Sequence, residues 1–192
     1  MTSNKQPVRY RSAVVLITAA LIFLLGAASL VDAQRRDYMT DAEVELVRDN
    51  QDIDARVDVL TKMIDRRLAI MNINAGGWKP SPKDADKWGD APVGKRPELL
   101  RDVKFLLQKA VDDIDDVASH DSSSLAQNKT TGKLFPKAVR NLAAAAGRYS
   151  SALRPLLDTT KDELETGAII ATLELCEEIA EAAAKLPSAP VK

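Results

Sequence analysis

The sequence predicts an all-α protein: an antiparallel four-helix bundle behind an N-terminal signal or anchor helix. Apolar residues recur in alternating steps of three and four along four long stretches, which is the period of a helix with one buried face. The aromatic fraction is only 4% within a hydrophobic fraction of 45%, so the core consists mainly of aliphatic side chains that suit closely packed helices. We expect helices over residues 40–71, 97–118, 136–154 and 160–186, running up, down, up and down.

The stretch 40–71 carries the longest uninterrupted helical pattern of the chain and organises the predicted bundle. Thr40 and Glu43 stand at the positions of a capping box, which marks a helix start. The apolar stripe that follows is a coiled-coil-like seam broken by two polar residues, Asn50 and Arg67. Arg67 is expected either to pair with the acidic end of the second helix or to extend outward to water.

Glycine and proline are dense between residues 72 and 96, which predicts a long loop. The loop contains both tryptophans, Trp78 and Trp88, whose large rings are costly to leave in water. In one interpretation the rings fold back as a lid over one end of the bundle, which we expect because ring burial stabilises a small domain directly. In the other, they form a partner- or ligand-binding surface, since long loops on rigid scaffolds often carry recognition.

Prolines and capping residues set the expected limits of the other three helices. Pro97 fits the first turn of the second helix and Pro136 opens the third, because a first-turn residue has no helical partner for its N–H group. Pro155 is expected to end or kink the third helix. Thr160 and Glu163 form a second capping-box pattern, which predicts where the fourth helix begins.

The fourth helix has apolar residues on more than one face. Glu174 is the only charged residue between positions 167 and 176, so this part of the helix has little polar surface. We therefore expect the helix either to be central in the bundle or to contribute to an oligomer contact. One apolar stripe consists of Leu164, Ala168, Ala171, Leu175, Ile179 and Ala182, and more apolar surface lies beside it at Ile169, Ile170, Leu173 and Cys176.

The N-terminus has the pattern of a targeting segment. Three basic residues precede an apolar run of nineteen residues, 13–31, and Val31 and Ala33 offer signal peptidase the side chains that it selects. Residues 1–33 are thus either a cleaved signal peptide or a retained anchor, because nineteen helical residues reach about 29 Å and just cross the hydrocarbon layer. The bundle domain then occupies 34–192 and ends in a loose tail at 187–192.

Charge and residue counts remove several classes of protein. The formal net charge is −1 and no basic face is apparent, which predicts no nucleic-acid partner. Cys176 is the only cysteine, so no intramolecular disulfide can form. The sequence contains neither a glycine-rich phosphate loop nor a nucleophile elbow, and Cys176 falls on an apolar helical face. We therefore expect a protein without a cofactor that is not an enzyme.

The candidate metal-binding residues are Asp112, Asp116 and His120, which are spaced four apart and so share one face of a helix. Two carboxylates and an imidazole can hold a divalent cation. The alternative is a solvated acidic helix end whose histidine is simply exposed. A ligating histidine normally comes with several converging ligands, which the sequence does not supply.

These observations predict a non-enzymatic interaction or structural module of the cell envelope, either periplasmic or anchored in the inner membrane. Its expected partners are another protein or a second copy of the chain. The N-terminal segment would bind the membrane if it is not cleaved. The alternative function is a small-ligand-binding or metal-binding helical bundle.

Overall fold

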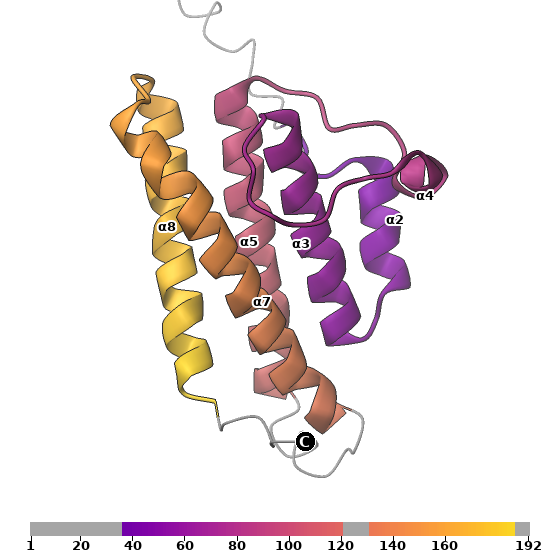
Figure 1. Ribbon diagram of the computed structural model, residues 1–192. Coiled ribbons are helices and arrows are strands. Elements are labelled where there is room, and N and C mark those ends of the chain that lie inside the picture. The colour runs from indigo at the N-terminus through magenta and orange to yellow at the C-terminus, as the bar shows by residue number, and fades with distance from the viewer. Residues whose placement is uncertain (1–35, 121–130, 187–192) are drawn as a thin grey trace, which may run out of the picture. The chain divides into compact units, whose positions relative to one another are not determined.

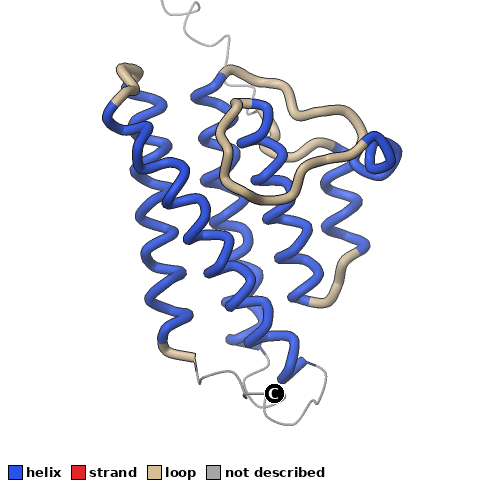
Figure 2. The backbone as a smooth tube through the Cα atoms, viewed as in Figure 1, coloured by secondary structure: helices blue, strands red, loops and turns tan. Residues whose placement is uncertain are grey.

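The computed structural model describes residues 36–120 and 131–186. The chain forms two compact units, Met1–Asp37 and Tyr38–Lys192, and the elements described below belong to the second. Within the described ranges all regular structure is helical and there is no strand (Figure 2). The predicted leader, its apolar run and the proposed cleavage after Ala33 lie outside the described residues.

Four long helices form the bundle, and consecutive ones run in opposite directions (Figure 1). They are α3 (Ile53–Ile70), α5 (Arg96–His120), α7 (Thr131–Leu153) and α8 (Glu163–Ala184). Helix α3 packs against α5 and α7, and α8 packs against the same two helices from the other side. The predicted all-α bundle of four helices with alternating direction is confirmed.

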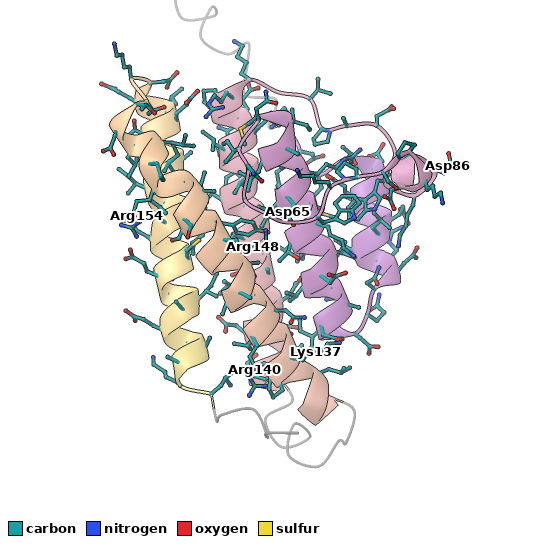
Figure 3. All side chains as sticks on the ribbon, in the orientation of Figure 1. Asp65, Asp86, Lys137, Arg140, Arg148 and Arg154 are labelled. Atoms are coloured by element: carbon teal, nitrogen blue, oxygen red, sulfur yellow. The ribbon has the colours of Figure 1, made fainter. Side chains whose placement is uncertain are left out.

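Helices that follow one another in the chain are not always adjacent in the bundle. Helices α5 and α7 lie across a diagonal, because each packs mainly on α3 and α8. Two ion pairs join α3 to α7, Asp54 with Lys137 and Asp65 with Arg148 (Figure 3). The second pair lies eleven residues beyond the first on both helices, since 65 − 54 and 148 − 137 are equal. Helices α3 and α7 are therefore adjacent and run in the same direction.

The predicted continuous helix over 40–71 is wrong, because the chain turns back at residues 50–52. Helix α2 (Asp41–Asp49) ends there and lies beside α3, to which it is antiparallel (Figure 1). Asn50 adopts an extended conformation, and its side chain donates to the Leu46 carbonyl at 2.7 Å. Arg56 donates to the Asn50 carbonyl at 3.0 Å. The polar break in the seam is thus a helix end, since asparagine competes well for backbone groups.

Two of the predicted helix starts are also wrong. Helix α7 begins at Thr131, so Pro136 lies inside it and not at its start. Pro136 is the sixth residue of α7, so it removes one hydrogen bond from the second turn and its ring is set against the turn before it. Helix α8 is capped by Asp162, whose carboxylate accepts from the N–H groups of Leu164 at 2.8 Å and Glu165 at 3.2 Å. Thr160 instead donates to the Glu165 side chain.

The other predicted helix limits are confirmed. Helix α2 begins with the predicted capping box of Thr40 and Glu43. Pro155 lies in a 3₁₀ turn, η2 (Arg154–Asp158), and α7 ends just before it. A proline has no N–H for the next helical hydrogen bond, which explains the change of helix type.

The core lies along the inner face of α3. Val57, Leu60 and Ile64 are completely buried there, so the central part of the predicted seam is confirmed. Tyr149 reaches into the same layer from α7, and its hydroxyl donates to the Thr61 carbonyl at 3.0 Å. Burial raises the pKa of Tyr149 well above its usual value. None of the helices within residues 36–120 and 131–186 has both the length and the apolar character needed to cross a membrane.

Candidate functional site

A buried cluster of charges joins α2 to α3 and α5. Arg67 is completely buried, and its guanidinium donates to both oxygens of the Glu43 carboxylate, at 2.9 Å and 2.8 Å. Asp102 lies 3.6 Å from Arg67 Nε on the α5 side. The acidic partner on α5 is therefore in the first turns of that helix, and not at its acidic end as one prediction for Arg67 had it. The other prediction, extension to water, is wrong.

Glu43 has a second role in the same place. Its backbone N–H donates to the Thr40 hydroxyl, and its carboxylate accepts from the Thr40 N–H at 3.0 Å, which closes the capping box of α2. The same carboxylate lies 3.4 Å from Arg66. One side chain thus caps α2 and pairs with two arginines, and Asp102 supplies the second negative charge of the cluster, so the buried charges are compensated.

Arg66 fixes the far end of the long loop. Its guanidinium donates to three consecutive carbonyls, those of Trp88 at 3.1 Å, Gly89 at 2.7 Å and Asp90 at 2.8 Å. Gly89 follows the short helix α4 (Ala85–Trp88) and has a φ of +58°. A Cβ atom at Gly89 would come within 2.9 Å of the Ala42 side chain, so glycine permits the close packing of α4 against α2.

Asp65 fixes the near end of the loop. Its carboxylate accepts from the Trp78 N–H at 2.8 Å and from Arg148 of α7 at 3.1 Å. Arg148 also donates to the Ala75 carbonyl at 3.0 Å, so α3, α7 and the loop meet at one charge pair (Figure 3). A Cβ atom at Gly77 would lie 2.2 Å from the Asp65 carboxylate. Only glycine lets the backbone approach the carboxylate this closely.

The two tryptophans fold back onto the bundle, as the lid interpretation expects. Trp88 is only 4% exposed, Trp78 is half-buried, and their ring centroids are 4.8 Å apart with planes tilted by 36°. The arm of the loop between α3 and α4 crosses the flank of α3, and the arm between α4 and α5 returns past the upper end of α3 to the start of α5 (Figure 1). A hollow of about 390 Å³ lies between the loop and the last turns of α3, bordered by Trp78, Lys79 and Asn72. Whether the rings bind a partner stays a prediction.

A second surface lies between α5 and α8. A groove of about 360 Å³ runs between Arg101, Lys104 and Phe105 on one wall and α8 residues on the other, which are Glu163, Leu164, Gly167, Ala168 and Ala171. Leu164 is 74% exposed and Phe105 is 39% exposed. The ammonium of Lys104 lies 5.2 Å from the Phe105 ring centroid, and Tyr38 packs against that ring from a centroid distance of 5.6 Å.

The groove shows where the apolar stripe of the fourth helix lies. Its first three members, Leu164, Ala168 and Ala171, line the groove, and Ala168 also packs against the core. The first half of α8 turns Ile169 and Leu173 to the core. Both apolar surfaces of the helix are therefore divided: Leu175 and Ile179 of the main stripe are buried with Ile169 and Leu173, whereas Leu164 is exposed.

The predicted metal residues lie near the end of α5. Asp112 and Asp116 are both exposed, and Asp112 accepts a hydrogen bond from Gln108 at 2.9 Å. His120 is the last residue of α5, and its side chain lies outside the described residues. Among the residues that the structure describes, no group of three or more potential metal ligands gathers. Metal binding at Asp112, Asp116 and His120 stays a prediction.

Cys176 is buried in α8, and burial raises the pKa of its thiol to about 11. The thiol is therefore protonated at neutral pH, whereas nucleophilic cysteines need a lowered pKa. This agrees with the sequence-based interpretation of a small buried side chain.

Sequence reasoning missed the buried charges and the groove. A signal for the charges existed: Asp65, Arg66 and Arg67 are consecutive in a helix, so at least one of them must point toward a packed neighbour. For the groove the signal was the second apolar face of the fourth helix, which left the choice of the buried side open. No protein-family model matches this chain, and neither a curated protein nor a solved structure matches it.

Proposed function

We propose that this chain is a non-enzymatic interaction module of the cell envelope that binds a protein through the groove between α5 and α8. The observation that carries the proposal is Leu164, a leucine that is 74% exposed beside a groove with an exposed aromatic ring. Apolar surface of this kind, rimmed by polar residues, is typical of interaction sites.

The distribution of charge supports a scaffold role for the rest of the bundle. Glu43, Arg66 and Arg67 hold α2 and the loop on α3, and Asp65 with Arg148 ties the loop to α7. These side chains are occupied by contacts that position helices. A bundle held in this way presents a fixed surface, which suits binding with little change of backbone shape.

For location, we propose export to the periplasm or anchoring in the inner membrane with the bundle on the outer side. The support is the basic N-terminus followed by the apolar run 13–31. Fractionation of cells that express the whole chain, with N-terminal sequencing of the protein, tests this. A mature chain that starts at Gln34 in the periplasm indicates cleavage, and an uncleaved chain in the membrane indicates the anchor. An uncleaved chain in the cytoplasm would overturn both.

The interaction is tested by photo-crosslinking in intact cells. A photoreactive amino acid in place of Arg101, on the groove wall, should give a protein adduct of defined mass. The control position is Lys62, which pairs with Asp58 on α3, the helix diagonally opposite α8 in the bundle. Adducts at Arg101 and none at Lys62 are expected. The same photoreactive amino acid in place of Gly167 probes the α8 wall of the groove. If neither Arg101 nor Gly167 gives an adduct, the proposal is overturned.

A small-ligand function is the second candidate, and the hollow beside Trp78 favours it. The hollow has a volume of about 390 Å³ and an aromatic border, both ordinary for small-molecule sites. Native mass spectrometry of protein purified from its own cells would show a bound molecule, and metal analysis of the same sample would test Asp112, Asp116 and His120. A sample that carries neither removes this candidate.

A further inference from the structure

We infer that the occupant of the groove between α5 and α8 is a second copy of this chain, in a twofold dimer in which Leu164 of each copy enters the groove of the other. The inference rests on the proposed function of this face as a protein-binding surface and names the partner.

The first support is shape. The protruding side chain and the groove that can receive one lie on the same face, since Leu164 stands at the edge of the groove that Phe105, Ala168 and Ala171 help to line. A twofold interface uses one patch twice, so a patch must contain both the projection and its receptor. This patch does, and each dimer would therefore bury two leucines in two equivalent places.

The second support is charge. The α5 wall has a net positive charge, because Arg101 and Lys104 line it together with a single carboxylate, that of Glu98. On α8, Glu163 and Glu174 are exposed, and the residues at 167–171 that lie between them are glycine, alanine and isoleucine. When α8 of one copy lies on the groove of the other, its glutamates meet the basic wall, and the twofold axis repeats the contact. Opposite charges across an interface favour the correct partner and speed its association.

The third support is the small size of the side chains on α8 where the second copy would pack. A Cβ atom at Gly167 would meet nothing within 4 Å, so the α8 backbone itself is accessible there. Ala168 and Ala171 lie half-buried next to it. Small residues let two helices approach closely, and the exposed Ile170 beside them adds apolar contact.

Charge also limits the extent of the contact. Toward the C-terminal ends of both helices the exposed residues are acidic, with Asp112, Asp115 and Asp116 on α5 and Glu177, Glu178 and Glu181 on α8. Like charges prevent close packing of that half. The dimer is therefore confined to the region around Gly167, and an interface below about 1,000 Å² is typical of weak association. We expect the dimer to be concentration-dependent.

The experiment is sedimentation equilibrium. The protein is purified from cells that express the whole sequence, and it is kept in detergent if it remains in the membrane. The wild-type protein should shift from monomer to dimer as its concentration rises. Leu164→Asp should remove the dimer and leave circular dichroism unchanged, because Leu164 is at the surface. The control is Val93→Asp, which changes an apolar residue that is even more exposed but lies in the loop before α5. It should dimerise like the wild type.

A mixing experiment identifies the second copy as the occupant. One variant reverses the basic wall with Arg101→Glu and Lys104→Glu, and the other reverses α8 with Glu163→Lys and Glu174→Lys. Each variant alone sets like charges against each other in both halves of the dimer and should stay monomeric. In their mixed dimer both halves join opposite charges, so an equimolar mixture should dimerise.

Three results would overturn the inference: a wild-type protein that is monomeric at every concentration, a dimer that survives Leu164→Asp, or variants that fail to associate when mixed. A monomeric wild-type protein that still gives an Arg101 adduct with a different protein in cells would overturn the dimer alone. Loss of all adducts in cells would overturn the proposed function as well.

Discussion

The two flanks of the bundle differ in which side chains they bury and which they expose. On the flank of α3 that faces α2 and the loop, charged side chains such as Glu43 and Arg67 are buried and paired. On the flank formed by α5 and α8, apolar side chains such as Leu164 and Phe105 are exposed beside a groove. A buried charge pair that loses one member leaves an uncompensated charge, whereas an exposed leucine contributes little to folding. The first flank therefore contributes to the stability of the fold, and the second is available for binding.

The largest effect is expected in the core itself, at the centre of α3. Leu60→Asp places a carboxylate with no partner among completely buried neighbours such as Val57 and Ile64. The domain should unfold, because the cost of a buried charge is comparable to the whole stability of a small domain. Circular dichroism and thermal melting measure this. An unchanged melting temperature would mean that α3 does not lie in the core.

The next effect concerns the aromatic part of the α2 flank. Removal of one buried aromatic ring typically costs about 3–5 kcal/mol. The double variant with Trp78→Ala and Trp88→Ala should lose more than this from its free energy of unfolding. The wild-type tryptophan emission should be blue-shifted, since Trp88 is buried and Trp78 packs against it. Denaturant unfolding and fluorescence spectra check both points. Solvent-like emission with unchanged stability would favour the binding surface over the lid.

Glu43→Gln tests the charged part of the same flank. The buried Arg67 and Arg66 would lose their main counter-charge, which should cost about 3–5 kcal/mol. Denaturant unfolding gives the difference. The matched control is Glu45→Gln on the same helix, which removes an exposed pair with Arg48 and should change stability by less than about 1 kcal/mol. Equal effects of the two changes would contradict the difference between buried and exposed charge.

The smallest effect on folding is expected on the α5–α8 flank. Leu164→Ser should alter the free energy of unfolding by no more than about 0.5 kcal/mol, as surface substitutions usually do. Ile169→Ser, five positions along the same helix, removes a completely buried side chain and should destabilise by several-fold more. If the two changes proved equally damaging, Leu164 would belong to the core and the contrast between the flanks would fail.

Much of the fold could be predicted from the sequence, because the spacing of apolar residues indicates which stretches are helical and which face of each helix is buried. The seam of α3 through Leu60 and Ile64 followed from that pattern, and so did the end of α7 before Pro155. The break at Asn50 could not be predicted with the same certainty. The same spacing of apolar residues continues across it, whereas the hydrogen bonds of Asn50 at the turn and the contacts of Glu43 with α3 appear only in the folded chain.

The candidate site was less accessible to sequence reasoning. In α8 two apolar faces compete, and the choice between Leu164 and Ile169 as the buried residue depends on where α5 and α7 lie. That placement comes from the diagonal arrangement of α5 and α7, which the spacing within one helix does not encode. The pairing of Arg67 with Glu43 likewise joins residues 24 positions apart through a turn that the sequence pattern concealed.

The double role of Glu43 has a consequence for the motions of the domain. A nine-residue helix at the edge of a bundle would ordinarily open and close by itself, and its amide hydrogens would exchange early. In α2 this opening would also withdraw the carboxylate that neutralises Arg67, which is completely buried. Opening of α2 would therefore leave the charge of Arg67 in the core without the Glu43 carboxylate, or would require Arg67 to become exposed. Amide hydrogens of α2 should exchange together with those of α3, so the two helices open as one cooperative unit.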